Sequence, residues 1–138
     1  MNESVHVFVG RLASRAEACL YTEQQWEPEP DESASDEEYE EWEDRNPTWM
    51  LKEDLNPPYL SPDFIETITT ADRFAYLGRL LTDPQGIEQI EAQGRGSNTL
   101  VLIFSGAFAE FPAVMRSTPT LRYLGEFGCD LHKWRETS

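Results

Sequence analysis

The residues of this chain that could do chemistry are two histidines, two cysteines and several neighbouring carboxylates. His6 and His132 lie near opposite ends of the 138-residue sequence, and no Ser, His and acid spacing is typical of a catalytic triad. Cys19 and Cys129 are also far apart and match no metal-binding spacing. They indicate free thiols, although a disulfide between them stays open. These four residues therefore predict neither a nucleophile site nor a metal centre.

Other catalytic patterns are absent too. The acid pairs Glu37/Glu38 and Glu40/Glu41 could hold a hard cation loosely, but they lack the alternating oxygen ligands of a calcium loop. The glycine-rich turn at 93–97 follows an expected helix and precedes an expected strand, which is the wrong order for a phosphate-binding loop. Phosphate-loop, hydrolase, zinc-protease and C-x-x-C motifs are missing. We expect no enzyme activity, no cofactor and no metal.

The strongest feature is the acidic run from Trp26 to Asp44. Eleven of its 19 residues are Asp or Glu, and no basic residue occurs between Arg15 and Arg45. A charge block of this kind is often only a solvated or disordered segment. The alternative interpretation is that the run is a docking surface for a cationic partner. A net charge of −15 repels nucleic acid and membrane surfaces and attracts a basic protein.

Part of the run has the pattern of a short helix, from Asp36 to Asp44. Ser35 and Glu38 have the spacing of a capping box, and acids fill the first turn, where the helix dipole favours them. Tyr39 and Trp42 share one face, while like charges four residues apart weaken the helix. The two rings must therefore pack on this protein's own body or on a partner.

Trp49 suits a core position, but its place just after the acidic helix also makes it a candidate contact. The candidate partner-binding residues are Asp36, Glu37, Glu38, Tyr39, Glu40, Glu41, Trp42, Asp44 and Trp49.

Three segments have strand composition. Ser4–Gly10 is rich in β-branched residues and predicts an interior strand with a partly buried His6. Residues 98–105 contain the apolar run LVLIF, which is typical of a central strand buried on both faces. Residues 120–127 alternate apolar and polar side chains and predict a half-buried strand nearer a sheet edge.

Helix signals lie between these strands. Starts are expected at Ser14, at Ser61-Pro62, near Thr70 and at Asp83-Pro84. The predicted inward residues of these four helices are, in order, Ala16, Cys19, Leu20 and Glu23; Phe64, Ile65 and Ile68; Phe74, Leu77, Leu80 and Leu81; and Ile87 and Ile90. The expected core comprises Val5, Val7, Val9, Phe74, Leu77, Leu81, Leu100, Leu102, Phe104 and Leu121.

This order of elements predicts the fold. We expect an α/β or α+β fold, a single domain over residues 1–138 with a small mixed β-sheet covered by helices. The acidic segment 26–44 is expected to protrude as a helix or loop. Charged residues interrupt the first twenty positions, and the longest apolar run is too short for a membrane span, so we expect a cytoplasmic protein with no membrane partner.

Four segments occur in the order seen in a known family: Val5–Gly10, Pro62–Glu66, Leu100–Phe104 and Leu121–Phe127. Together they resemble immunity proteins of family twenty-two, the partners of polymorphic and type VI secretion toxins. The overall pattern is especially similar to a type VI immunity protein that neutralises a DNase effector of the Gly-His-His nuclease class. The acidic run is longer than the family pattern, and 105–108 is less acidic and aromatic.

The resemblance implies an immunity protein that binds a cognate basic nuclease toxin in a 1:1 complex, without binding nucleic acid itself. This agrees with the acidic run, because a nuclease must present a cationic surface to phosphates. Two alternatives stay open: an acidic adaptor or chaperone for a basic secreted protein, and an enzyme that uses the acid pairs with a metal.

Overall fold

The computed structural model describes residues 3–130, so His132 lies outside the described residues. Its helices and strands are β1 (Ser4–Gly10), α1 (Arg15–Thr22), α2 (Asp36–Arg45), α3 (Met50–Leu55), the 3-10 helix η1 (Pro62–Phe64), β2 (Ile65–Ile68), α4 (Ala75–Leu80), α5 (Pro84–Gln93), β3 (Thr99–Phe104), the 3-10 helix η2 (Ser105–Phe108) and β4 (Arg122–Gly128).

The four strands form one sheet in the order β2-β3-β1-β4, and all three pairings are antiparallel. The α/β fold class is therefore confirmed, but the sheet is antiparallel rather than mixed among the described strands. β1 and β3 lie in the centre, with Val7 opposite Leu102. All six residues of β3 are buried, as the apolar run predicts.

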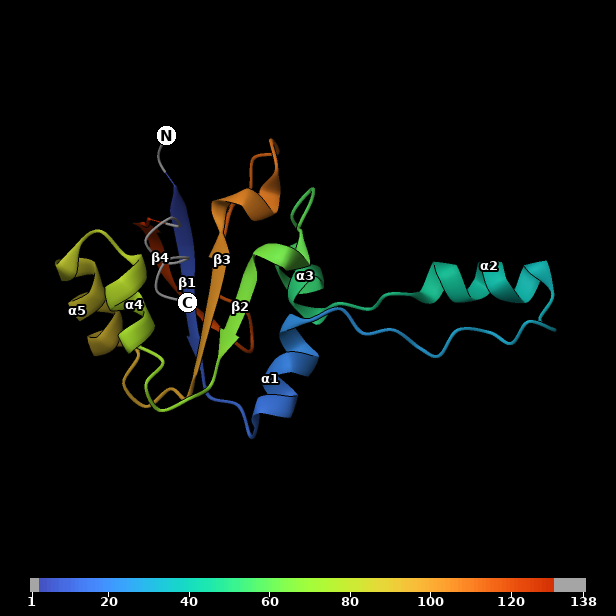
Figure 1. Ribbon diagram of the computed structural model, residues 1–138, viewed down its shortest axis with the longest axis horizontal. Helices are drawn as coiled ribbons and strands as arrows, with labels where there is room; N and C mark the ends of the chain where they lie inside the picture. Colours follow the sequence, from blue (N-terminus) through green and yellow to red (C-terminus); the bar gives the residue numbers. More distant parts are fainter. Residues whose placement is uncertain (1–2, 131–138) are drawn as a thin grey trace.

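Helices cover both faces of this sheet (Figure 1). On one face, Val7 and Leu102 pack in a cluster with Leu77 of α4 and Ile90 of α5. The other face forms a second cluster, in which Phe8 of β1 packs with residues of α1, α3 and η2. Successive strand residues point to opposite faces, so the continuous apolar run of β3 supplies both clusters at once.

Most local predictions are confirmed. The strands at 4–10, around 99–104 and around 122–128 form, and β4 lies at a sheet edge. Ser14 and Asp83 cap α1 and α5 by accepting hydrogen bonds from the backbone N–H groups of Glu17 and Gln85. All the expected core residues are buried except Phe74, which is partly buried against the first cluster.

The helix predicted from Ser61 is wrong. Pro62 starts only the three-residue η1, and Ile65–Ile68 form β2, which pairs with β3. Two isoleucines and a threonine favour extended backbone, and the ladder with β3 gives their polar groups partners. The missed signal is this cluster of β-branched residues, which continues through Thr70.

The predicted inward face of α1 is also wrong. Ala18, Tyr21 and Thr22 are the buried residues, whereas Leu20 is 52% exposed. The buried polar atoms have partners: the Thr22 hydroxyl donates to the carbonyl of Ala18, and the Tyr21 hydroxyl donates to Asp54. Because the Thr22 and Tyr21 hydroxyls have hydrogen-bond partners, these polar residues can be buried. The buried face of α1 therefore differs from the face that hydropathy alone predicts.

Helix α3 was not predicted as a helix. It buries Leu51 and Leu55, which lie four residues apart, and it ends at Asn56 in a left-handed conformation with φ of 49°. Cys19 and Cys129 are free thiols, as expected. Within residues 3–130, no helix has the length and apolar content needed to cross a bilayer.

We predict that Leu102→Ala lowers the free energy of unfolding by ~2–5 kcal/mol, because truncation of a buried leucine leaves a cavity. Leu102 is fully buried in β3. Val114→Ala is the control: Val114 is 80% exposed, and the change should stay within about 0.5 kcal/mol. Urea denaturation measures both. A loss below about 1 kcal/mol for Leu102→Ala would contradict the packing of β3.

We also predict a pH effect from His6. Burial lowers its pKa, an effect that the nearby Glu126 carboxylate opposes, and Nδ1 lies 2.8 Å from the Tyr123 hydroxyl. The folded state thus favours neutral His6. The contribution of His6 to the free energy of unfolding is fully present above its unfolded-state pKa of about 6.5 and is lost as the pH falls below that value. Between pH 7.5 and 5.5, wild type should lose more stability than His6→Gln in urea titrations; equal losses would contradict the prediction.

Candidate interaction surface on an acidic arm

Residues 26–47 leave the domain as an arm, which we name the acidic arm (Figure 1). An extended outgoing limb leads to the tip, and α2 returns along it toward α3. At the base, Gln25 and Thr48 exchange two backbone hydrogen bonds of 2.7 and 2.9 Å. This antiparallel bridge joins the two limbs where they meet the domain.

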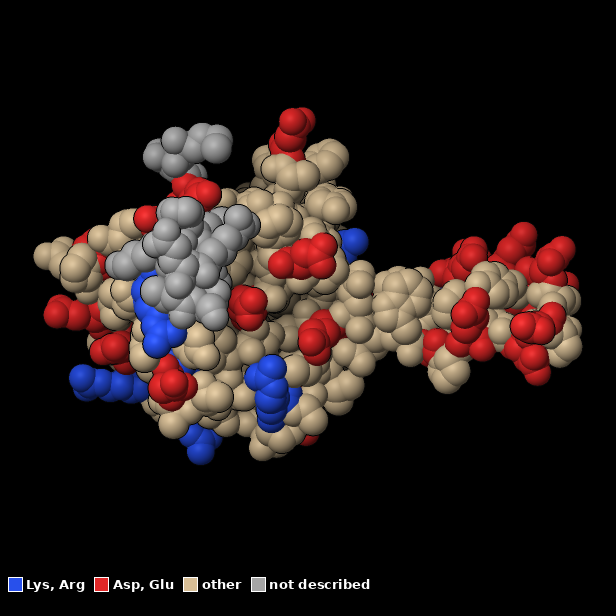
Figure 2. All heavy atoms as spheres, in the orientation of Figure 1, with Lys and Arg blue, Asp and Glu red and all other residues tan. Residues whose placement is uncertain are grey.

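The acidic arm holds most of the protein's net charge. Its eleven acids and one base, Arg45, give it a formal charge of −10 out of −15 for the whole chain. Figure 2 shows carboxylates crowded on the arm, whereas acids and bases are mixed over the visible face of the domain. The arm is therefore a separate, strongly negative surface.

Local sequence makes α2 a helix, as predicted. The Ser35 hydroxyl accepts a 3.1 Å hydrogen bond from the Glu38 backbone N–H, which satisfies one free donor of the first turn. Three acids in the first turn and Arg45 in the last turn complement the helix dipole. No residue of α2 is buried, so its stability depends on the outgoing limb.

The aromatic face of α2 packs on the arm itself. The Trp42 ring lies 5.5 Å from that of Tyr39 and 5.9 Å from that of Trp26 on the outgoing limb, measured between centroids. The Trp42 indole N–H also donates to the carbonyl of Glu27 over 3.1 Å. The rings thus form a small apolar contact between the two limbs, and both Tyr39 and Trp42 keep part of their surface exposed.

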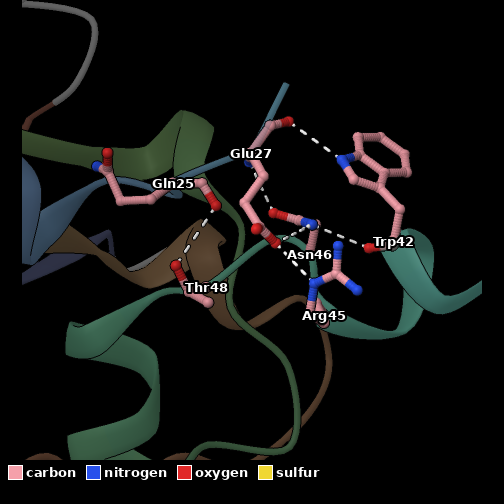
Figure 3. A network of polar contacts seen from close by, with 6 residues as sticks. All are labelled: Gln25, Glu27, Trp42, Arg45, Asn46 and Thr48. Atoms are coloured by element: carbon pink, nitrogen blue, oxygen red, sulfur yellow. Dashed lines mark hydrogen bonds and ion pairs between the residues drawn. The ribbon is translucent and has the colours of Figure 1, made fainter. Parts of the chain in front are cut away.

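Glu27 links the two limbs near the base (Figure 3). Its carboxylate accepts hydrogen bonds from Arg45 at 3.0 Å and from the Asn46 amide at 2.9 Å. These two donors, Arg45 first, lower the pKa of Glu27 below its usual range. The Asn46 side chain also accepts from the Glu27 backbone N–H. Arg45, the only basic residue of the arm, is therefore paired with an acid of the arm itself.

Further out, the Tyr39 hydroxyl donates to the Glu29 carboxylate, and this bond raises the pKa of Tyr39. Beyond it the arm encloses a hollow of about 440 Å³ that Asp31, Glu32 and Asp36 help to line. A hollow of this size with several carboxylates suits a lysine or arginine side chain of a partner. The tip of the arm therefore gathers several carboxylates around one hollow.

The structure brings the predicted contact residues 36–44 together on α2. Whether they bind a partner stays a prediction. Trp49 requires a correction: it is only 4% exposed, and its indole N–H donates to the carbonyl of Thr22 over 2.6 Å. It packs in the cluster with Phe8, so it is a core residue and not an exposed contact residue.

Sequence reasoning missed the contribution of the outgoing limb to this surface. Four acids lie there, at positions 27, 29, 31 and 32, and Trp26 is 57% exposed at its start. Their composition is evident in the sequence, but the prolines at 28 and 30 indicate only an extended connection. The pairing of this limb with α2 depends on tertiary contacts.

We predict that two tryptophans seven residues apart behave oppositely. Trp49→Ala should lower the free energy of unfolding of the domain by about 3–5 kcal/mol, as for other buried aromatics. Trp42→Ala should change it by less than about 0.5 kcal/mol, because Trp42 contacts the arm alone. Instead, amide hydrogen exchange in α2 should become faster. A large loss of domain stability in Trp42→Ala would show that the arm packs on the domain.

No metal site accompanies these carboxylates: within residues 3–130, no group of three or more His, Cys, Asp or Glu side chains could hold a metal ion. No protein-family model, curated protein or solved structure matches this sequence.

Proposed function

We propose that this protein is an immunity protein that binds a basic nuclease toxin and blocks its nucleic-acid surface. The observation that carries the proposal is the acidic arm, which presents a charge of −10 on a segment held away from the domain. A nuclease holds phosphates with Lys and Arg, so its substrate site is complementary to such an arm. No catalysis is part of this function.

The charge spacing on α2 supports the proposal. Seven of its ten residues are acids, and ten helical residues span roughly 15 Å. This gives about one negative charge per 2 Å, compared with one per ~1.7 Å along duplex DNA. The arm therefore offers a nuclease about the same linear charge density as its substrate, without a phosphodiester bond to cleave.

We expect the affinity for the toxin to depend on the charges and rings of the arm acting together rather than on any single residue. Single exposed carboxylates contribute little, because solvent and salt screen them. Many together accelerate encounter, and a cationic partner relieves the like-charge repulsion within α2. The partly exposed rings of Trp26, Tyr39 and Trp42 add apolar contact area, which usually carries more of the binding energy.

The resemblance to immunity proteins of family twenty-two supports a toxin as the partner, in a 1:1 complex in the cytoplasm. The alternative is an acidic adaptor or chaperone for a basic secreted protein, which would use the same arm. The two functions differ in outcome: an immunity protein abolishes nuclease activity in the complex, whereas an adaptor leaves the activity of its cargo intact.

The test is co-expression with the protein whose gene adjoins this one. Wild type should restore growth, co-purify with the partner and inhibit its cleavage of DNA. Replacement of Glu37, Glu38, Glu40 and Glu41 by Gln should slow association about tenfold or more at low salt and flatten its salt dependence, as measured by stopped flow.

A matched control removes the same charge from the domain through Asp72→Asn, Glu88→Gln, Glu91→Gln and Glu110→Gln, all at exposed positions. This variant should associate much like wild type. Equal slowing in both variants would mean that net charge alone matters and that the arm has no special role. Failure of rescue together with failure to co-purify would reject the immunity function.

A further inference from the structure

Strand β2 forms an open edge of the sheet. It pairs with β3 on one side, and among the described residues no strand pairs with its other side. The other edge differs, because segments of the chain lie along β4. The Tyr123 backbone N–H donates to the Ser117 hydroxyl at 2.9 Å, and that of Thr82 donates to the Gly128 carbonyl at 3.2 Å. Of the two edges, β2 is the one with room for a further strand.

Two adjoining grooves follow this open edge. One, of about 410 Å³, runs between Trp26 and β2, and the next, of about 310 Å³, continues past Thr69 to Tyr76. Both are lined by Glu66 and Thr67 of β2. Together they extend from the base of the acidic arm along the whole strand, which is the space that an added extended segment needs.

Arg15 lies where the two grooves meet and lines both. Its guanidinium donates to the Thr67 backbone carbonyl at 3.2 Å and to the Thr69 hydroxyl at 3.3 Å. The Thr67 carbonyl thus has a side-chain partner where a neighbouring strand would supply a backbone N–H. A charged side chain at an edge is a common protection against unwanted strand pairing, and an exposed one can be displaced.

Charge decides which occupant fits. A second copy would bring another arm of −10 toward the first, because the groove ends at Trp26, where the arm begins. Like charges of this size disfavour that pairing. A basic extended segment gains from the arm and from Glu66, which is exposed on the edge strand.

We propose that an extended, basic segment of the partner protein adds to β2 as a fifth strand, with its end directed onto the acidic arm. This inference rests on the proposed function, since it assigns the binding mode of the same cationic partner. Backbone hydrogen bonds would fix the register of the segment, while the arm attracts its charge. In this binding mode the incoming strand displaces the Arg15 side chain from the Thr67 carbonyl.

The test uses a nine-residue peptide of alternating Lys and Val with blocked ends. Its control has the same side chains and charge, with every interior amide N-methylated so that it cannot form a ladder. The first peptide should slow hydrogen exchange within Ile65–Ile68 about tenfold or more, as measured by NMR on labelled protein, and the control should not.

Arg15→Ala should tighten binding of the first peptide about two- to fivefold, the effect of one exposed charge or hydrogen bond. Arg95→Ala, which removes an equal charge at another exposed position, should alter the affinity less. Calorimetry measures both variants.

Three results would overturn the inference. The first is no binding of the peptide at millimolar concentration. The second is equal binding of both peptides with unchanged exchange in β2, which would leave charge recognition by the arm intact. The third is protection of β2 that rises with protein concentration alone, which would assign the edge to a second copy. None of these depends on a toxin, so rescue in the co-expression test stands or fails separately.

Discussion

The central pairing of β1 with β3 is the constraint on which the rest of this structure depends. β3 is buried along its whole length and β1 at all but its end residues, and each contributes side chains to the two clusters of the core. A strand pair without a solvent face must have a layer on each side. The two groups of helices therefore occupy opposite faces, and β2 and β4 become the edges (Figure 1).

The core cannot hold the protein's acids, because burial of an unpaired charge costs much free energy. Nearly half of the acids lie instead on the acidic arm, whose limbs are joined by contacts of their own. The bridge between Gln25 and Thr48 closes the base of the arm, and the bond from Trp42 to Glu27 lies within it. Mutual repulsion of the carboxylates thus acts mainly on the arm, and the domain is left with the smaller part of the net charge.

The arm begins beside the open edge of the sheet, and this junction could combine two kinds of recognition. Charge attraction acts over distance but specifies little geometry. A backbone ladder acts only in contact but fixes direction and register. Trp26 belongs to both regions, because it starts the outgoing limb and lines the groove along β2. A partner held at both would be oriented as well as attracted.

The sequence by itself determined the features that depend on near neighbours. The caps at Ser14, Ser35 and Asp83 need only a hydroxyl or carboxylate and a backbone N–H two or three residues away. The apolar run of β3 identifies a buried strand because its composition suits no other place. The acids of α2 were likewise identified as a surface from their density alone.

Only the tertiary structure decided the secondary structure and burial of residues whose contacts are distant in sequence. Ile65–Ile68 became a strand through pairing with β3, although a proline start signal precedes them. Trp42 and Trp49 lie only seven residues apart, yet one packs on the outgoing limb and the other is buried with its indole N–H bonded to the Thr22 carbonyl of α1. The physical reason is that burial depends on which surfaces meet, and no local pattern records that.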